Sequence, residues 1–208
     1  CANVLDRSSL EEVRKKILSD FGACDILING AGGNNPKGTT QKEYFEPSDL
    51  DSDTVTFFDL DPDGVEFVFR LNFLGTLLPT QVFAKDMAKG EKGCIINISS
   101  TNGMNTYYPM CIDYDASKAA LISLTHNLAF EFGPYIHVNC IAPGFIGTEN
   151  ELDGYDEEFL KEEQKKIMVK RYGKPEEVAY LVKFLISNEA DFINNSIIRI
   201  DGGQIGSM

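Results

Sequence analysis

Short buried strands alternate with helices along this chain, and that alternation limits the folds available to it. Residues 93–98 form an apolar run of strand length that ends in two serines. A second apolar run, 137–141, follows an apolar helical segment, and shorter strands are expected at 25–29 and 196–200. Strands that alternate with helices form a parallel sheet with helices on both faces. The sequence therefore predicts an α/β fold with a doubly wound, mostly parallel sheet.

The helices are marked by their ends. Ser8 and Glu11 have the spacing of a capping box, which predicts a helix from there to about residue 20. Further helices are expected over 62–87, 114–132 and 175–187, with a shorter helical insertion over 155–170, whereas residues 33–60 are expected to be irregular. We find no repeat or second unit, so residues 1–208 are predicted to form one domain.

Composition disfavours several classes of function. The net charge is −13, from 32 acidic and 19 basic residues. Such an excess of negative charge disfavours nucleic acid and anionic membrane surfaces as partners. No apolar run approaches the 18 residues that a membrane span needs. The five cysteines lack Cys-x-x-Cys spacing, which is typical of reduced thiols in a cytoplasmic protein.

Metal chemistry is not expected. The two histidines, His126 and His137, have no partner at metal-ligand spacing. The stretch 59–64 imitates the start of a calcium loop, but Arg70 stands where that loop requires a glutamate.

Tyr114 and Lys118 carry the clearest chemical signal. They are four residues apart in a helical segment, so their side chains share one face. A nearby ammonium group lowers the pKa of a tyrosine from its ordinary value of about 10. A serine at the carboxyl end of the preceding strand, Ser99 or Ser100, could hold the oxygen that gains or loses the proton. Together these groups could interconvert an alcohol and a carbonyl.

With these residues the chain resembles the short-chain dehydrogenase/reductase family. The resemblance spans nearly the whole chain and rests on motifs in family order. They are Asn29-Gly-Ala-Gly32, Asn72 in Phe-Arg-Leu-Asn-Phe, Ile-Asn-Ile-Ser-Ser100, Tyr114-x-x-x-Lys118, Val-Asn-Cys-Ile-Ala-Pro-Gly144-x-x-x-Thr148, Gly-Lys-Pro-Glu-Glu-Val178 and Asp-Gly-Gly203. The resemblance implies a Rossmann-like fold, an NAD or NADP cofactor and a small-molecule substrate.

The resemblance also implies a catalytic set of four residues. Tyr114 would be the general acid/base, and Lys118 would lower its pKa and bind the nicotinamide ribose. Ser100 would steady the substrate oxygen, since the family motif uses the second serine. Asn72 would carry a water that links Lys118 to solvent.

Further residues would bind the cofactor. The resemblance places Asn3 and Val4 at adenine, and Asn29, Ala31 and Gly32 beside the adenosine ribose. It places Pro143, Gly144, Ile146 and Thr148 around the nicotinamide, with Ile146 and Thr148 near its carboxamide.

The start of the chain departs from the family pattern. Cys1 to Leu5 resemble the end of the family's third strand, and no Thr-Gly-x-x-x-Gly-x-Gly loop occurs. We therefore expect an N-terminally truncated member that lacks the first strands and the glycine-rich loop.

Three functions are compatible with this sequence. The long segment after Asn29 resembles the fructuronate reductase (mannonate dehydrogenase) type, which implies a sugar-acid substrate selected by residues 33–58 and 149–172. A carboxylate there needs a cation, and Lys37, Lys42 and Arg171 are candidates. One alternative is a 3-oxoacyl thioester reductase, which would use a basic docking patch on Lys165, Lys166, Lys170 and Arg171. A truncated, non-catalytic member is the other.

The family resemblance also predicts a homodimer or homotetramer. The helices that begin near Pro62 and Asp113 would form its interface. Leu121, Leu124 and Leu128 exceed what one sheet face needs, and so we expect them at that interface.

Overall fold

Four parallel strands form the centre of the molecule. The structure, a computed structural model, describes residues 1–105 and 110–204, and of residues 150 and 151 only the backbone. The strands are β1 (Ile26–Asn29), β2 (Gly93–Ile98), β3 (Ile136–Pro143) and β4 (Ile197–Ile200), and they lie side by side in chain order. The predicted doubly wound, parallel α/β architecture is confirmed.

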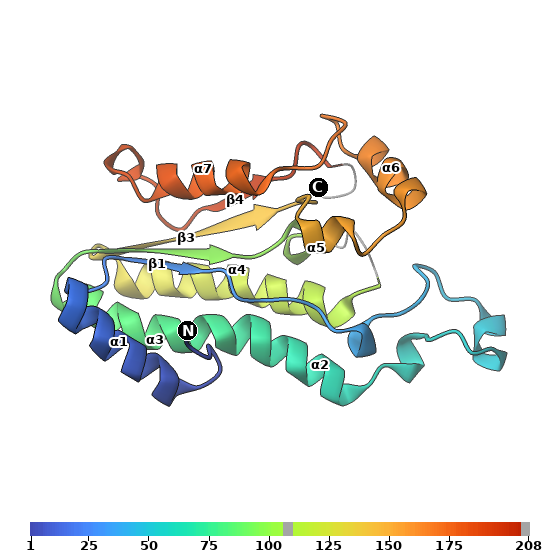
Figure 1. Cartoon of the computed structure of the whole chain (residues 1–208), viewed down its shortest axis with the longest axis horizontal. Helices are drawn as coiled ribbons and strands as arrows, with labels where there is room; N and C mark the ends of the chain where they lie inside the picture. Colours follow the sequence, from blue (N-terminus) through green and yellow to red (C-terminus); the bar gives the residue numbers. More distant parts are fainter. Residues whose placement is uncertain (106–109, 205–208) are drawn as a thin grey trace.

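Helices cover both faces of this sheet (Figure 1). One face packs against α3 (Gly75–Lys89) and α4 (Ile112–Phe132), with α1 (Arg7–Phe21) outside α3. The other face carries α7 (Pro175–Leu185), while α5 (Glu149–Leu152) and α6 (Glu157–Lys166) lie near the carboxyl ends of the strands. The residue that caps α1 is Asp6, whose carboxylate accepts the N–H groups of Ser8 and Ser9, so the predicted cap at Ser8 was wrong.

The long helix expected over 62–87 is continuous but not uniform. It begins as α2 (Pro62–Phe69), widens into a π-helical turn over Arg70–Leu74 and continues as α3. Its 28 residues are apolar enough, by length and composition, to cross a membrane, but half of its most apolar window is buried inside the structure. A core helix of a water-soluble protein has the same character.

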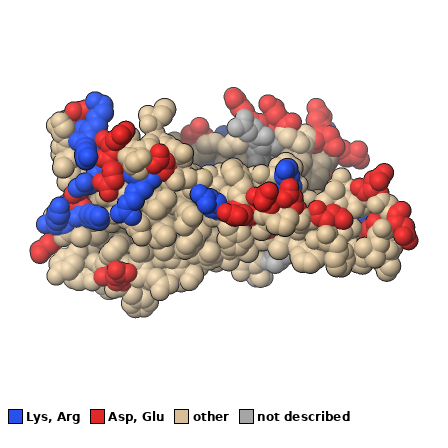
Figure 2. All heavy atoms as spheres, turned by 90° about the horizontal axis from the view of Figure 1, so that it is seen from below, with Lys and Arg blue, Asp and Glu red and all other residues tan. Residues whose placement is uncertain are grey.

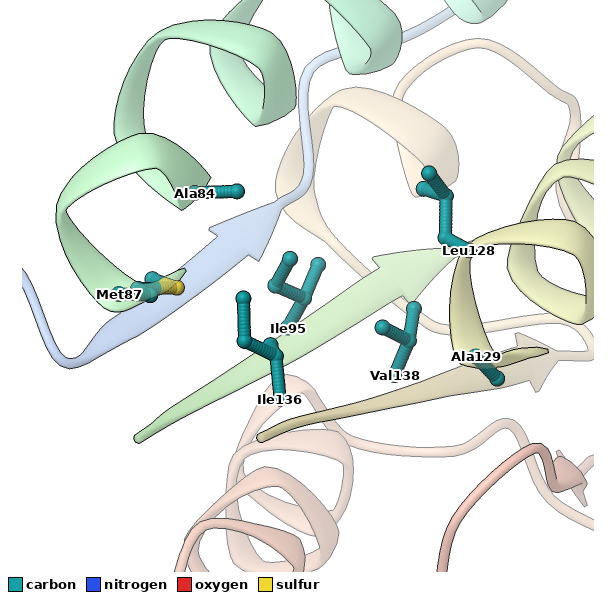
Figure 3. Close-up of a cluster of buried hydrophobic side chains, with 7 residues drawn as sticks. All are labelled: Ala84, Met87, Ile95, Leu128, Ala129, Ile136 and Val138. Atoms are coloured by element: carbon teal, nitrogen blue, oxygen red, sulfur yellow. The ribbon is translucent and has the colours of Figure 1, made fainter. Parts of the chain in front are cut away.

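Each face of the sheet has its own apolar core. Figure 3 shows the first, where Ile95 and Val138 of the sheet meet Met87 of α3 and Leu128 of α4. Successive strand residues point to opposite faces, so Ile96 belongs to the second core, under α7. Both isoleucines are fully buried, which explains why β2 is apolar along its length.

A ladder of buried polar groups crosses the sheet. Asn29 and Asn97 are partners in the register of β1 and β2. The Asn29 amide donates to Asn97 Oδ1 at 2.9 Å and to Thr80 Oγ1 at 3.0 Å. Asn97 in turn donates to Thr125 Oγ1 on α4 at 2.9 Å. Both amide nitrogens are therefore hydrogen-bonded to other buried side chains, as burial requires.

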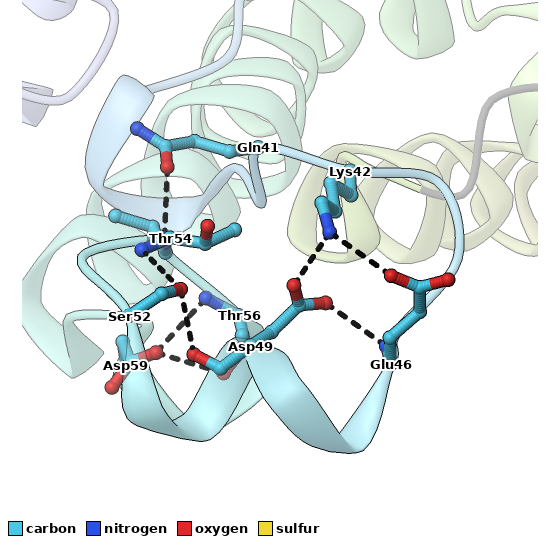
Figure 4. Close-up of polar contacts among 9 residues, drawn as sticks. Gln41, Lys42, Glu46, Asp49, Ser52, Thr54, Thr56 and Asp59 are labelled. Atoms are coloured by element: carbon cyan, nitrogen blue, oxygen red, sulfur yellow. Dashed lines mark hydrogen bonds and ion pairs between the residues drawn. The ribbon is translucent and has the colours of Figure 1, made fainter.

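Residues 36–61 form short turns that project beyond the carboxyl ends of the strands (Figure 1). The segment was expected to be irregular, but it contains 3₁₀ turns at Pro36–Gly38, Pro47–Asp51 and Phe57–Asp59. Figure 4 shows how side chains tie it together: Lys42 bonds to buried Asp49, and Asp49 accepts the Glu46 N–H. Local polar contacts thus replace a core here.

Truncating the central strand should test the first core. We expect Ile95→Ala to lower the free energy of unfolding by about 2–5 kcal/mol, because it leaves a cavity in a tightly packed region. Ile26→Ala, on the edge strand where Ile26 is 40% exposed, is the matched control and should cost less than about 1 kcal/mol. Urea denaturation measures both, and equal losses would contradict this assignment of the core.

Candidate functional site

A cavity of about 390 Å³ opens at the carboxyl ends of β2 and β3, where open α/β sheets bind ligands. This volume suits a small molecule. Its lining, called here the site cavity, comprises Gly33, Asn34, Ser100, Thr101, Asn102, Cys111, Tyr114, Gly144, Phe145, Ile146, Thr148, Tyr155, Phe159, Glu163 and Gln204.

The two candidate serines have different positions. Ser99 points away from the site cavity and donates its hydroxyl hydrogen to the carbonyl of Lys118 at 2.7 Å. Ser100 lines the cavity with Tyr114, and its Oγ accepts the N–H of Asn102 at 3.2 Å. That bond occupies one lone pair of Ser100, so the hydroxyl hydrogen is available for a substrate oxygen.

Lys118 lies behind Tyr114 in the protein interior. Its side chain is 5% exposed, and its Nζ donates to the carbonyl of Ile98 at 3.0 Å. The Nζ atom lies 5.5 Å from the centroid of the Tyr114 ring. Burial disfavours the charged form and lowers the pKa of Lys118 to about 8. The ammonium is thus charged at neutral pH and close enough to act on the phenol.

Asn72 joins the loop after β1 to α4. Its amide donates to the carbonyl of Gly33 at 2.9 Å and to Ser117 Oγ at 2.8 Å, and its Oδ1 accepts the Gly33 N–H at 2.8 Å. A methyl group at Gly32 would lie 2.8 Å from Asn72 Oδ1 and 3.1 Å from Lys118 Nζ. Only glycine lets the chain pass so closely, and this close passage brings Asn72 and Lys118 together. The π-helical turn, a frequent feature of functional sites, presents Asn72 here.

Two carboxyl groups flank Tyr114 in the first turn of α4. Asp113 is buried; its Oδ1 accepts the Tyr114 N–H at 2.8 Å, and its Oδ2 has no hydrogen-bond partner among the described residues. Asp115 accepts a hydrogen bond from Asn102 Nδ2 at 2.8 Å. Burial raises the pKa of Asp113, and it raises the pKa of Asp115 to about 6 against the opposing effect of Asn102.

Aromatic rings also line the site cavity, namely Phe145, Tyr155 and Phe159. Tyr155 stacks on Phe159 with ring centroids 4.5 Å apart, and Phe145 stacks on Tyr172 at 4.3 Å. These rings come from the segment between β3 and α7, which includes residues 149–172, predicted to select the substrate. The first predicted region, residues 33–58, contributes Gly33 and Asn34 to this lining. Several residues between Thr40 and Phe57 line a separate cavity of about 230 Å³.

The residues expected at the nicotinamide lie at this site. Gly144, Ile146 and Thr148 line the site cavity together with Tyr114, and Pro143 ends β3, where it pairs with Ile200. Gly144, Ile146 and Thr148 therefore share one cavity with Tyr114, whereas Pro143 is outside its lining.

The residues expected at adenosine lie outside the lining. Ala31 and Gly32 are exposed after β1, whereas the Asn29 side chain belongs to the buried ladder. Asn3 Oδ1 accepts the N–H of Leu5, and Val4 packs near Gly75 of α3.

The expected partners of a substrate carboxylate lie elsewhere. Lys37 pairs with Asp61 at 3.1 Å, Lys42 with Asp49, and Arg171 with Glu177. The hydrogen bonds from the Arg171 side chain and the Lys174 N–H lower the pKa of Glu177 to about 2. Among the described residues, the lining of the site cavity contains no lysine or arginine. The prediction that one of these three cations lies near the substrate is therefore not supported by the geometry.

Sequence reasoning missed several lining residues. Asn102 and Gln204 carry amides, Glu163 is a buried carboxyl paired with Lys166, and Phe145 contributes an aromatic ring. Asn102, Phe145 and Gln204 each had a local signal, since each lies within two residues of a motif residue: Ser100, Gly144 and Gly203, respectively. In the part of the chain that the structure describes, no group of three histidine, cysteine or acidic side chains could hold a metal.

Comparison with known proteins places this geometry among oxidoreductases. A family model described as enoyl-(acyl carrier protein) reductase matches residues 1–204. An uncharacterized oxidoreductase of Haemophilus influenzae is 47% identical over 97% of this chain and 73% of its own length. A 3-oxoacyl-[acyl-carrier-protein] reductase of Thermotoga maritima is 34% identical over 98% of this chain and 75% of its own length.

A solved structure from Haemophilus influenzae has a closely similar fold. It superposes with a TM-score of 0.90 and 45% identity, covering 97% of this chain and 74% of that one. It is described as a candidate D-mannonate oxidoreductase, and NAD is bound to it.

Removing the buried ammonium should stabilise the fold. The pKa of Lys118 falls from 10.5 in the unfolded chain to about 8, so we expect Lys118→Met to raise the free energy of unfolding by about 1–3 kcal/mol at pH 7. The penalty on the wild type is complete below pH 8 and disappears as pH rises towards 10.5, so the gain should shrink over that range.

Urea denaturation at pH 7 and pH 10 measures this difference. Lys85→Met, on the exposed side of α3, is the control and should change little. A variant at position 118 that is less stable than the wild type at pH 7 would show that the bond to Ile98 outweighs the cost of burial.

Proposed function

The chain belongs to the short-chain dehydrogenase/reductase family of NAD(P)-dependent oxidoreductases, and on that premise we propose that it interconverts the alcohol and ketone forms of a sugar acid such as D-mannonate and D-fructuronate. One observation carries the proposal: Ser100 and Tyr114 line a single cavity, and Lys118 lies directly behind Tyr114. These are the groups that carbonyl reduction requires.

The protein's own residues would manage the proton and the oxygen. Tyr114 gives a proton to the carbonyl oxygen during reduction and takes it back during oxidation, as a general acid/base. The Ser100 hydroxyl donates to the same oxygen and holds it in place. The Lys118 ammonium favours the phenolate that remains after proton transfer. Asn72 fixes the loop that packs against Lys118.

The site fits a nicotinamide cofactor, which supplies or accepts the hydride when bound. Gly144, Ile146 and Thr148 would hold the nicotinamide, because they line the cavity in front of Tyr114. The exposed backbone at Ala31 and Gly32 offers a surface without bulky side chains, which a cofactor can approach closely.

The character of the site cavity favours a hydroxylated substrate. Asn34, Asn102, Thr148 and Gln204 offer amide and hydroxyl groups, each able to donate or accept a hydrogen bond. The aromatic wall suits the C–H faces of a sugar chain. A carboxylate would be held by these neutral donors in place of a cation. The described function of the similar Haemophilus influenzae protein points to the same substrate class.

The thioester alternative receives less support from the surface. Of the basic residues that could dock an acidic acyl carrier, Lys165 pairs with Glu162, Lys166 with Glu163 and Arg171 with Glu177. The patch is therefore largely neutralised. A non-catalytic role is disfavoured because Ser100, Tyr114 and the buried Lys118 are brought together.

We also propose a homo-oligomer in the cytoplasm, whose interface lies on the expected helices α2 and α4 but uses other residues than the expected leucines. Leu121 and Leu128 are buried in the chain's own core, and Leu124 packs against it, so these leucines do not form an interface. Phe130 of α4 and Phe67 of α2 are instead 81% and 45% exposed. Figure 2 shows the molecule from the side of these helices: charged side chains of both signs lie mainly along the upper part of the view, and a wide uncharged area occupies the lower part.

Turnover with defined substrates tests the proposed reaction. We expect the protein to oxidise D-mannonate with NAD or NADP, and to reduce D-fructuronate, faster than it reduces a 3-oxoacyl thioester. Tyr114→Phe should lower kcat at least about 100-fold, because it removes the proton donor and keeps the ring.

Cofactor binding to Tyr114→Phe, followed by fluorescence titration, is the control and should be unchanged. Near-normal turnover by that variant would overturn the catalytic assignment. Preferential turnover of the thioester would replace the sugar-acid substrate with the alternative.

Light scattering tests the proposed assembly. The wild type should have the mass of a dimer or tetramer at micromolar concentration, and Phe130→Glu should lower that mass because it places charge in the apolar interface. Phe192→Glu, at another exposed aromatic residue outside these helices, is the matched control. A monomeric wild type would contradict the proposal.

A further inference from the structure

We propose that Asn102 binds a substrate oxygen beside the reacting carbonyl, and that Asp115 is the positioning residue that orients its amide. This inference rests on the proposed function. It adds a specificity-determining contact and a support for it to the site formed by Ser100 and Tyr114.

Asn102 occupies the wall of the site cavity next to the reacting groups. It lies in the 3₁₀ turn Thr101–Gly103, directly after Ser100, and lines the cavity with Ser100 and Tyr114. Its backbone N–H donates to Ser100 Oγ at 3.2 Å. A group that bonds Ser100 Oγ from this turn is within reach of a substrate held by Ser100.

The side chain of Asn102 has hydrogen-bonding capacity to spare. A primary amide has two N–H donors and one carbonyl acceptor. One N–H of Asn102 goes to Asp115 Oδ1 at 2.8 Å. Among the residues that the structure describes, the second N–H and the carbonyl oxygen have no hydrogen-bond partner, and so both remain for a ligand. Since no cation is found among the described lining residues, such an N–H is a suitable donor to a hydroxyl or carbonyl oxygen.

Asp115 determines which way the amide faces. A carboxylate only accepts hydrogen bonds, so it requires the nitrogen of Asn102 and rejects the oxygen. With its pKa near 6, Asp115 is ionised at neutral pH. The carboxylate is half-buried in the first turn of α4, immediately after Tyr114. The same helix therefore carries Tyr114 and the group that orients Asn102.

The turn has little freedom to move away from the helix. A methyl group at Gly103 would lie 2.6 Å from the carbonyl carbon of Lys118 and 2.8 Å from the nitrogen of Ala119. The turn thus rests on the α4 backbone at Gly103 and is bonded to α4 at Asn102. Two attachments fix its orientation, and so the amide has one position relative to Tyr114.

A double-mutant cycle tests this assignment. The variants are Asn102→Ala, Asp115→Leu and the two combined, with KM and kcat measured for D-mannonate oxidation and KM for NAD measured in parallel. Each single change should raise KM for D-mannonate about 10-fold with little effect on kcat or on KM for NAD, the size of one lost hydrogen bond. The double variant should be no worse than either single one.

Two further variants separate positioning from structure. Asp115→Asn keeps the size of the side chain but can pair with either end of the Asn102 amide, so it should raise KM for D-mannonate less than Asp115→Leu does. A KM for NAD that is unchanged in Asp115→Leu excludes a folding defect in that variant. Asp63→Asn removes a first-turn carboxylate from α2, far along the chain from the site, and should change no kinetic constant. An unchanged KM in Asn102→Ala, or fully additive losses in the double variant, would overturn the inference.

The same cycle distinguishes this inference from the substrate assignment. If the wild type reduces a 3-oxoacyl thioester and does not oxidise D-mannonate, the sugar-acid function fails. The cycle is then run on acetoacetyl-N-acetylcysteamine. Non-additive losses with that substrate still support the contact and its positioning by Asp115, and additive or absent losses overturn both.

Discussion

The buried ammonium of Lys118 is the group on which the rest of the site depends. Placing a charge in a protein interior is unfavourable, and the fold accepts it only with compensating contacts. The carbonyl of Ile98 accepts a hydrogen bond from the Lys118 ammonium, and the Ser99 hydroxyl donates a hydrogen bond to the carbonyl of Lys118. These reciprocal bonds join the end of β2 to the middle of α4. Because Ser100 follows that strand end and Tyr114 lies one turn earlier on α4, the same bonds set the distance between the reacting groups.

The local part of this arrangement was readable from the sequence. Tyr114 and Lys118 share a face because helical periodicity requires it, and Ser100 follows a strand whose apolar run marks its end. Parallel strands then bring their carboxyl ends to one edge of the sheet, which is why Gly144, from β3, was also placed at the site. Residue spacing within a helix and the ends of strands depend on short segments of sequence, so they can be predicted without knowledge of the tertiary structure.

The predictions that the structure does not support concern contacts between residues that are not adjacent in the sequence. Lys37 and Arg171 were expected near a substrate because they lie in the right segments, but each pairs with a nearby carboxylate that spacing alone did not single out. Leu121 was expected at an interface because it belongs to an apolar stripe on its helix. Such a stripe shows only that the helix face is buried, and here it is buried within the same chain. The link from Asn102 to Asp115 joins residues 13 apart. That link forms only because Gly103 allows a turn to rest on a helix.

The amide ladder across the sheet has a consequence for assembly of the fold. β1 is a short edge strand whose isoleucines at 26 and 28 are 40% and 48% exposed, so apolar burial distinguishes poorly between correct pairing and a slip by one residue. A slip would turn Asn29 away from Asn97 and Thr80 and leave buried amides unpaired, at a cost of about 1–3 kcal/mol each. The hydrogen bonds of the two asparagines therefore fix the register of β1 against β2. A chain with β1 out of register is less stable because its buried amides lack hydrogen-bond partners. Because β1 ends only three residues before Gly32, the same hydrogen bonds also determine where Gly32 passes Lys118.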